Sequence, residues 1–267
     1  MKYLFRLHDG ALAEAVRIPL ENQKFTICLS SQAGCAMGCT FCATGRMGLT
    51  RNLEAWEIVA QFIAVRDEAE APVTGAVFQG QGEPLHNYPS VIKAAQILSH
   101  PCGGRIAAKA ITISTVGLVP MIKRYARERH PYRLIISLTS AIDERRKTLL
   151  PVAGAWPVAE VADAVRAYQR VNGGRVTIAW VMLGGINTGL DEVEALQTHF
   201  GDLPLRINLI DVNDARPDGF RPPGDRELAA FRDALRALEV PVVRRYSGGA
   251  AKHAACGMLA GTCHPSS

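Results

Sequence analysis

The stretch Cys35-Ala36-Met37-Gly38-Cys39-Thr40-Phe41-Cys42 places three thiols within eight residues, separated by three residues and then by two. A tight loop with this spacing can point three thiolates at one iron–sulfur cube. The loop offers no fourth protein ligand, so one iron of such a cube keeps an open coordination position. We therefore interpret Cys35, Cys39 and Cys42 as the ligands of a 4Fe-4S cluster.

Two other interpretations of the three cysteines stay open at this point. A structural zinc site needs a fourth Cys or His nearby, and His8 and His86 are unpromising for that purpose. Cysteines that serve packing or redox chemistry without a metal are less favoured, because these three lie in a loop that contains glycine.

Length and composition describe an ordinary globular protein. The 267 residues suffice for one large domain or two at most, and 48% of them are hydrophobic and 21% charged. The formal net charge of +5 is compatible with a nucleic-acid partner but too small to argue for one alone.

The cysteines and the N-terminus both indicate a cytoplasmic protein. Seven cysteines, three of them crowded together, do not form the pattern of a secreted disulfide framework. Residues 1–9 have no apolar core of a signal peptide, and no run approaches the ~18 apolar residues of a membrane span.

After the cysteine loop, short apolar strands alternate with amphipathic helices. The expected strands are 24–29, 74–79, 110–114, 133–138, 175–182, 205–210 and 241–245, and the expected helices are 53–68 (N-capped by Asn52), 89–98, 119–127, 158–171, 190–200 and 225–238. This alternation predicts an α/β fold with a parallel sheet covered by helices, a partial (β/α)6 TIM-like barrel. A doubly wound sheet is the alternative.

The chain before the first of these strands reads as a hairpin. Residues 3–7 and 12–18 flank the turn signal His8-Asp9-Gly10. We expect an N-terminal β-hairpin extension over residues 1–22 and the barrel core over residues 23–267. Within the core, the polar loop 211–224 is long for a connection and is a candidate functional loop.

A glycine-rich turn follows the second expected core strand, with the sequence Gly80-Gln81-Gly82-Glu83-Pro84. Its glycines let the backbone approach a ligand, and Glu83 can accept hydrogen bonds from a ligand ammonium group. Together with the cysteine spacing and Phe41, this turn resembles the radical S-adenosylmethionine superfamily. There the open iron chelates the amino and carboxylate groups of S-adenosyl-L-methionine.

Further stretches narrow the resemblance to the RlmN/Cfr adenine methyltransferases. Similar residues flank the cluster loop at 28–35, 41–45 and 48–53. Others are found at Thr112–Gly117, Ile136–Leu138, Arg175–Leu183, Ile207–Ile210 and Ala254–Gly261, and the opening hairpin also resembles the family.

The resemblance implies a two-cysteine mechanism. One cofactor molecule methylates the C-terminal cysteine, here Cys256, by nucleophilic displacement. A second, bound at the cluster, is cleaved to a 5′-deoxyadenosyl radical that removes a hydrogen from the S-methyl group, and the methylene radical adds to an sp2 carbon of adenine, C2 or C8. Cys28 then resolves the adduct, which leaves a transient Cys28–Cys256 disulfide. Cys102 and Cys263 have no counterpart in the family.

The same resemblance assigns the contacts to S-adenosyl-L-methionine and shows where this chain departs from the family. The implied contacts are Gly82, Glu83, Ser114, Ser137, Leu138, Thr139 and Asn213. The family's Ser-Leu-His-Ala is Ser137-Leu138-Thr139-Ser140 here, and its Asn-Pro-x-Pro-Gly is replaced from Asn213 onward. Residues 248–253 lack the usual acidic residue. These changes lie in loops that should face the substrate.

The resemblance implies RNA, rRNA or tRNA, as the substrate and a flavodoxin-like or other electron donor as a partner of a monomeric enzyme. We expect a short form of the family without its accessory RNA-holding N-terminal domain. Candidate phosphate contacts are Arg46, Arg51, Lys109, Arg244, Arg245 and Lys252, whose other interpretation is solvated surface charge.

Two alternatives remain, one within enzymes and one from another class. One is a related methylase that acts on a small molecule or a peptide in a biosynthetic pathway. The other is a non-catalytic iron–sulfur protein with a binding or regulatory role, which would need neither Cys28 nor Cys256.

Overall fold

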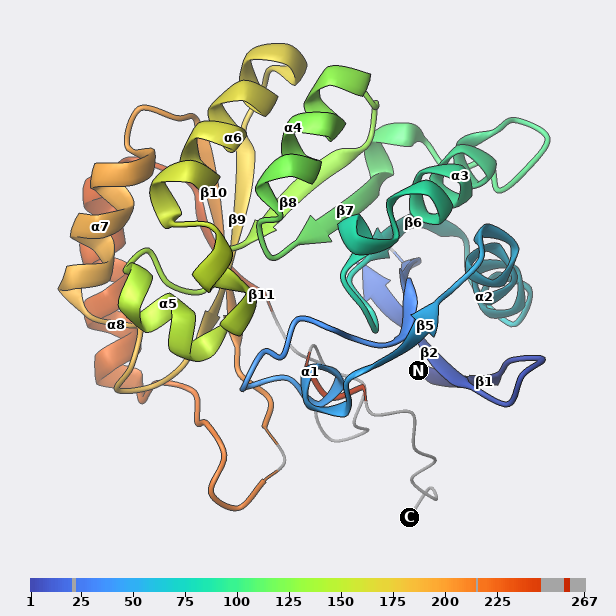
Figure 1. Ribbon diagram of the computed structural model, residues 1–267, viewed down its shortest axis with the longest axis horizontal. Helices are drawn as coiled ribbons and strands as arrows, with labels where there is room; N and C mark the ends of the chain where they lie inside the picture. The colour runs from blue at the N-terminus through green and yellow to red at the C-terminus, as the bar shows by residue number, and fades with distance from the viewer. Residues whose placement is uncertain (21–22, 215, 246–256, 260–267) are drawn as a thin grey trace.

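The structure is a computed structural model that describes residues 1–20, 23–214, 216–245 and 257–259. Its main sheet has the strand order β1-β2-β3-β6-β7-β8-β9-β10-β11 (Figure 1). The strands are β1 (Lys2–Arg6), β2 (Leu12–Leu20), β3 (Lys24–Leu29), β6 (Val73–Phe78), β7 (Ile111–Thr115), β8 (Arg133–Ser137), β9 (Val176–Met182), β10 (Leu205–Asp211) and β11 (Val242–Arg245).

From β3 onward all neighbouring strands are parallel and follow one another in chain order. A doubly wound sheet reverses its strand order at a switch point and has helices on both faces. The sequential order seen here instead curls the sheet in one direction, as in a barrel. The predicted partial (β/α)6 barrel is thus confirmed.

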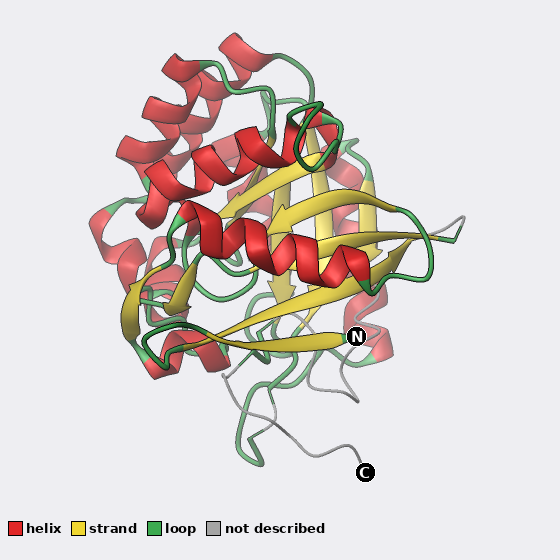
Figure 2. Cartoon of the chain, turned by 90° about the vertical axis from the view of Figure 1, so that its right-hand side faces the viewer, coloured by secondary structure: helices red, strands yellow, loops and turns green. Residues whose placement is uncertain are grey.

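Helices cover the outer face of this sheet (Figures 1 and 2). One long helix follows each main-sheet strand from β3 to β10, namely α2 (Ala55–Asp67), α3 (Tyr88–Ser99), α4 (Val119–Glu128), α6 (Val158–Asn172), α7 (Leu190–Phe200) and α8 (Asp225–Leu235). Their apolar stripes are buried, as Ile58, Phe62 and Val65 show for α2. No helix in the described residues has the length and apolarity that a membrane span requires.

The predicted hairpin is present and extends the sheet. β1 pairs with β2, and β2 pairs with β3, both antiparallel, so that Val16 lies opposite Cys28. The turn between β1 and β2 has Gly10 at φ 84°, a conformation that favours glycine. Residues 21–22 lie outside the described residues, and the division between a hairpin extension and a core at residue 22 stays a prediction.

The sequence did not predict several short elements. They are the small antiparallel sheet of β4 (Gln32–Gly34) and β5 (Leu49–Asn52), and the helices α1 (Ala43–Met47) and α5 (Asp143–Leu149). None is long enough to show a hydrophobic period.

The predicted start of helix α2 was wrong. Glu54, and not Asn52, is its N-cap, because Glu54 and Glu57 form a capping box. Asn52 belongs to β5, and its side chain accepts a hydrogen bond from Gln32.

Candidate active site

A cavity opens at the edge of the sheet where the parallel strands end. Residues from the ends of β3, β6, β7, β8, β9 and β10 line it, together with the cysteine loop and the described C-terminal residues Gly257 and Leu259. Most of the residues predicted for the site line this cavity, namely Cys28, Cys35, Cys39, Cys42, Gly82, Glu83, Ser114, Ser137 and Asn213. The fold therefore brings together groups that are almost 200 residues apart in the sequence.

The small β4–β5 sheet closes the base of the cysteine loop. The backbone N–H of Cys35 donates to Gly48 O at 2.8 Å. Gly34 has φ 77°, and a Cβ there would lie 2.0 Å from that same carbonyl oxygen. Only glycine fits this position, so the start of the loop is fixed by backbone packing.

The other end of the loop leads directly into helix α1. Gly45 of this helix packs against the loop, because a Cβ on it would lie 2.8 Å from Cys39 N. On the far side, the N–H of Thr40 donates to Leu149 O at 3.0 Å, which ties the loop to the end of α5. The three thiols thus sit on a backbone that is held from three directions.

A single zinc ion and an iron–sulfur cluster make different demands on the spacing of three thiols. In the part of the chain that the structure describes, no three Cys, His, Asp or Glu side chains are grouped to hold one metal ion. Three thiolates on one zinc lie within roughly 4 Å of each other, because each Zn–S bond is about 2.3 Å long. The thiolates of a cube bind different irons and stand further apart.

Burial shapes the ionisation of the cysteines. It raises the pKa of the Cys35 thiol to about 11 and the pKa of Cys39 well above its usual value, and the charge of Cys42 adds to both effects. Coordination to iron would oppose this rise in pKa, since a coordinated thiol loses its proton. Without metal the thiols of Cys35 and Cys39 are therefore neutral, and metal binding through them would release protons.

Glu83 is the buried acid of the site, with 2% of its surface exposed. Its two carboxylate oxygens accept from Leu85 N at 3.0 Å and from Val116 N at 2.9 Å. Burial nevertheless raises the pKa of Glu83 to about 7. Gly82, at φ 97°, brings the turn against Gln32, whose amide oxygen accepts from Glu83 N at 2.9 Å.

The remaining predicted contacts divide into two groups. Ser114, Ser137 and Asn213 stand at the ends of three strands and line the cavity. Leu138 and Thr139 are fully buried and do not line it. Leu138 instead donates its N–H to Ala179 O, and Thr139 has φ 63° in the turn after β8. Direct cofactor contacts by these two residues stay predictions.

Cys28 lies where the C-terminal segment meets the barrel. It is buried in a small apolar cluster with Val16 and Leu259. Two bonds from helix α1 hold this segment, one from Ala43 N to Gly257 O at 2.8 Å and one from Thr44 Oγ1 to Leu259 O at 2.5 Å. Cys256 and Cys263 lie outside the described residues, and Cys102 is exposed.

Sequence reasoning missed Thr44, which is 3% exposed and links the helix after Cys42 to the C-terminal segment. Its only sequence signal is its position in the Phe41–Gly45 motif. It also missed Arg146, a buried cation whose pKa is lowered by burial to about 10. Nothing in the local sequence distinguishes Arg146 from its neighbour Arg145.

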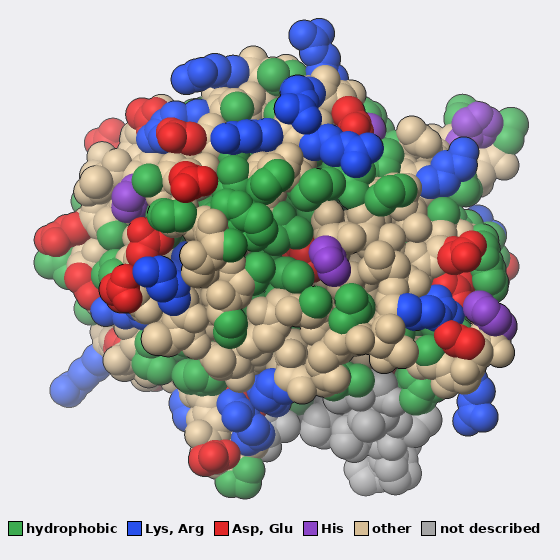
Figure 3. Space-filling view, viewed as in Figure 1, with side chains coloured by type: hydrophobic (Ala, Val, Ile, Leu, Met, Phe, Trp, Pro, Cys, Tyr) green, Lys and Arg blue, Asp and Glu red, His purple; other side chains and the backbone are tan. Residues whose placement is uncertain are grey.

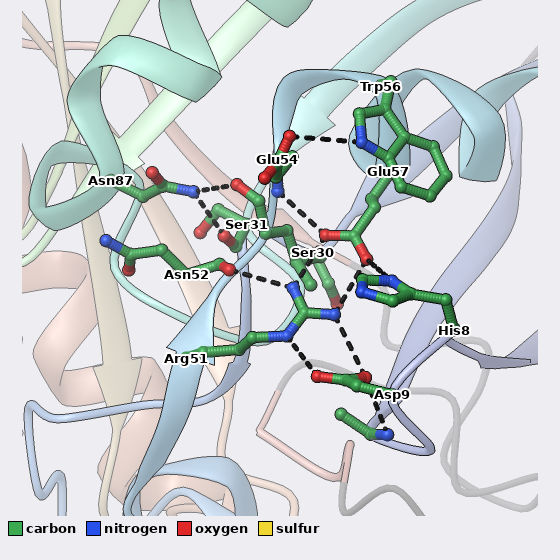
Figure 4. Close-up of polar contacts among 12 residues, drawn as sticks. His8, Asp9, Ser30, Ser31, Arg51, Asn52, Glu54, Trp56, Glu57 and Asn87 are labelled. Carbon is green, nitrogen blue, oxygen red and sulfur yellow. Dashed lines mark hydrogen bonds and ion pairs between the residues drawn. The ribbon is translucent and has the colours of Figure 1, made fainter.

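Several basic residues proposed for phosphate contacts already have acidic partners. Arg51 is held by Asp9 and by Glu57 at 2.6 and 2.7 Å (Figure 4). Arg244 pairs with Asp211 at 2.8 Å, and Arg46 lies 3.8 Å from Asp214. Lys109 precedes β7 and so lies at the edge of the sheet opposite the cavity.

Basic side chains also gather at the lower edge of the molecule, where Figure 1 places the loop after β10 (Figure 3). On this loop Arg216 donates to Thr40 O at 3.3 Å and pairs with Asp214 at 2.6 Å. The polar loop singled out in the sequence thus contacts the cysteine loop directly. Lys252 lies outside the described residues.

Comparisons with known proteins agree with this geometry. Residues 29–196 match the radical SAM superfamily. A probable RNA methyltransferase of Anaeromyxobacter sp. (strain Fw109-5) is 53% identical over 97% of this chain and 77% of its own length. The dual-specificity RNA methyltransferase RlmN of Geobacter sulfurreducens is 42% identical over 97% of this chain and 71% of its own length. The crystal structure of a radical SAM methyltransferase from Sphaerobacter thermophilus superposes with a TM-score of 0.92 at 40% identity, over 98% of this chain and 77% of that one.

Proposed function

The chain belongs to the RlmN-type RNA methyltransferases of the radical SAM superfamily, and from this premise we propose that it methylates C2 or C8 of adenine in RNA through an S-methylcysteine. The observation that carries the proposal is one cavity lined by the three cluster cysteines, Glu83 and Cys28, onto which the residues after Cys256 are bonded. A protein that only bound a cluster would need neither Cys28 nor an anchored C-terminal segment.

The binding roles follow from the donor atoms. Cys35, Cys39 and Cys42 hold the 4Fe-4S cluster, and Glu83 accepts the ammonium group of S-adenosyl-L-methionine, with Gly82, Ser114, Ser137 and Asn213 around it. When bound, the cluster and this cofactor supply the electron, the radical and the methyl group. Leu138 and Thr139 contribute by shaping the turn after Ser137.

Cys256 and Cys28 have separate roles in the transfer of the methyl group. The sulfur of Cys256 accepts the methyl group and carries it as a thioether, because an aromatic C–H carbon is too weak a nucleophile to take a methyl group directly. Once the methyl carbon is bonded to adenine, the Cys28 thiolate attacks the sulfur of Cys256. A disulfide forms between the two sulfurs as the bond between Cys256 and the methyl carbon breaks, and the methylated ring carbon gives up its hydrogen as a proton while the methyl carbon gains a proton. The one electron left over from the radical addition passes to a one-electron carrier, and the methylated product is released.

The burial of Cys28 supports this role. It is 8% exposed, lines the cavity and packs against Leu259, three residues after Cys256. A sulfur that must attack a second sulfur needs such a position, sheltered from solvent thiols and oxidants but open to the site.

Two experiments test the proposal. Anaerobic reconstitution with S-adenosyl-L-methionine should yield 5′-deoxyadenosine and methylated Cys256; the catalytic proposal fails if neither appears. Cys28→Ala should stop after carbon–carbon bond formation and accumulate a protein–substrate adduct, whose mass identifies the substrate. An adduct of RNA supports the proposal, and an adduct of a small molecule or peptide would replace RNA as the substrate.

Digested total RNA from a deletion strain provides the matching test in cells. We expect 2-methyladenosine or 8-methyladenosine to fall relative to the parent strain and to return with the wild-type gene but not with Cys256→Ala. Unchanged levels of both nucleosides would contradict the RNA assignment.

A further inference from the structure

Among the described residues, Arg146 on helix α5 is a cation buried without a carboxylate bonded to it. Only 1% of it is exposed. Its Nη2 donates to Val116 O at 2.7 Å and its Nη1 donates to Trp156 O at 3.1 Å, and both acceptors are neutral carbonyls. Among the described residues, Nε has no hydrogen-bond partner and no acidic group forms an ion pair with this guanidinium.

Such a charge is unfavourable unless an anion lies nearby. The pKa of Arg146 is lowered to about 10 by burial, so the side chain still carries its charge at neutral pH. The charges of Asp143 and Cys39 act in the opposite direction and favour the cationic form. Arg146 and the cluster-binding thiol of Cys39 are therefore within electrostatic reach of each other.

The packing of α5 explains this proximity. Leu149, three residues after Arg146, accepts the N–H of Thr40 at 3.0 Å, and Thr40 directly follows Cys39. Leu150 donates its own N–H to Arg146 O at 2.8 Å and lines the cavity. The end of the helix that carries Arg146 is thus part of the wall around the cysteine loop.

On its other side Arg146 contacts the turn after β7, which in turn contacts Glu83. The carbonyl of Val116 accepts from Arg146, while the N–H of Val116 donates to Glu83. Gly117, at φ 107°, leaves room for this contact, because a Cβ there would lie 3.1 Å from Nη2. The turn therefore connects a buried cation with a buried carboxylate.

We propose that Arg146 is a positioning and potential-setting residue: its buried charge beside the cysteine loop favours the reduced cluster, and its bond to Val116 fixes the turn that orients Glu83. Reduction adds one electron, taken from an external one-electron donor, and makes the cluster more negative. A fixed cation in a medium of low dielectric stabilises that added charge. The inference rests on the proposed function only through the presence of the cluster.

The test is the midpoint potential of the reconstituted protein without substrate, followed by electron paramagnetic resonance of the reduced cluster. Arg146→Gln removes the charge but keeps an N–H donor for Val116. We expect its equilibrium constant for reduction to fall at least tenfold, which is a shift of about 59 mV to more negative potential. Arg146→Lys keeps the charge, so its equilibrium constant for reduction should stay within about threefold of the wild-type value.

A matched control lies next to it on the same helix. Arg145 is already paired with Asp191 and Glu192 at 2.7 and 2.6 Å, so Arg145→Gln should leave the potential unchanged. An unchanged potential in Arg146→Gln, or an equal shift in Arg146→Lys, would overturn the proposal.

A second variant covers the case in which Arg146→Gln does not fold. Asp143→Asn keeps the Oδ1 that accepts from Val158 N at 2.8 Å and removes a negative charge near Arg146. This variant should shift the midpoint potential to more positive values. A shift to more negative values, or no shift, would contradict the proposed effect of the Arg146 charge on the cluster. These measurements need the cluster but no methyl transfer. If the proposed methyl transfer is wrong but the inference about Arg146 is right, the potentials will shift as expected while no methylated product forms. The two failures can therefore be told apart.

Discussion

Glu83 shows how burial sets the chemistry of a single residue. Its pKa of about 7 lies well above that of an ordinary glutamate, since the carboxylate has little contact with water. The charged form is the one that binds an ammonium group. The site is therefore ready to bind its cofactor above neutral pH and loses this ability as the pH falls.

This leads to a pH prediction for cofactor binding. Below pH 7 the affinity of the reconstituted protein for S-adenosyl-L-methionine should fall about tenfold per pH unit, as the carboxylate gains its proton. Glu83→Gln should bind about ten- to a hundredfold more weakly at pH 8, which corresponds to one charge-assisted hydrogen bond of about 1.5–3 kcal/mol. Anaerobic equilibrium dialysis between pH 6 and 8 measures both. An equal pH dependence in the glutamine variant would show that another group is responsible.

Thr44 gives a second prediction at the scale of one side chain. Thr44→Val removes the hydroxyl that donates to Leu259 O and leaves that carbonyl unpaired, at a cost of about 1–3 kcal/mol. Cluster content and cofactor cleavage should stay close to wild type, while methylation of Cys256 and methyl transfer should fall by tenfold or more. Mass spectrometry of the C-terminal peptide measures the methylation of Cys256, and product formation measures methyl transfer.

Thr44→Ser is the matched control for this change, because it keeps the hydroxyl and loses only a methyl group. It should methylate Cys256 at close to the wild-type rate. Equal losses in the serine and valine variants would mean that the packing of the methyl group, and not the hydrogen bond, anchors the C-terminal segment.

At the scale of elements, the β4–β5 sheet determines whether the cysteine loop can form. Gly34 ends β4 and Gly48 directly precedes β5, and the two have almost the same φ, 77° and 75°. Their surroundings differ, because a Cβ on Gly34 would meet Gly48 O at 2.0 Å, whereas a Cβ on Gly48 would meet nothing within 4 Å.

The two glycines therefore provide a matched pair of substitutions. Gly34→Ala should break the pairing at the base of the loop and lower the iron bound per protein to less than half. Gly48→Ala should meet no steric clash and cost only backbone strain, about 1–3 kcal/mol, because φ 75° and ψ 178° are rarely adopted by other residues, and it should keep the cluster. Iron and sulfide analysis after reconstitution measures both. Equal iron contents in the two variants would contradict the steric explanation.

At the scale of the whole molecule, one arginine fastens the N-terminal hairpin to the core. Arg51 of β5 donates to Asp9 in the hairpin turn and to Glu57 in helix α2, whose carboxylate is fully buried (Figure 4). These contacts lower the pKa values of both acids. The clamp holds together elements that are 42 residues apart in the chain.

Arg51→Ala should lower the free energy of unfolding by about 3 kcal/mol at pH 7, because the buried Glu57 carboxylate loses its arginine partner and, among the described residues, keeps only the N–H of Glu54 and the contact with His8. The acids have lowered pKa values in the folded state, so this stabilisation is present above their ordinary values, about pH 4, and is lost as the pH falls further. The difference between variant and wild type in urea unfolding should therefore shrink at pH 3. Arg66→Ala, which removes an exposed pair with Asp67, should cost less than about 1 kcal/mol at either pH.

The long elements and the cluster residues were predictable from sequence for a simple physical reason. Strands such as β9, buried along nearly all its length, show continuous apolar runs, and helices such as α6 show a regular apolar face. Cys35, Cys39 and Cys42 could be predicted as cluster ligands because their spacing is a local property of the chain. Such properties belong to local stretches of the chain and need no knowledge of the fold.

The sequence by itself thus determined the α/β alternation, the spacing of the three cysteines and the acidic turn at Glu83. Only the tertiary structure decided between a barrel and a doubly wound sheet, since both share the same alternation and differ in the order in which strands pair. It also placed Cys28 against Leu259, bonded Thr44 to the C-terminal segment and buried Arg146 near the cysteine loop. Contacts between distant residues depend on packing in three dimensions, and no local pattern encodes them.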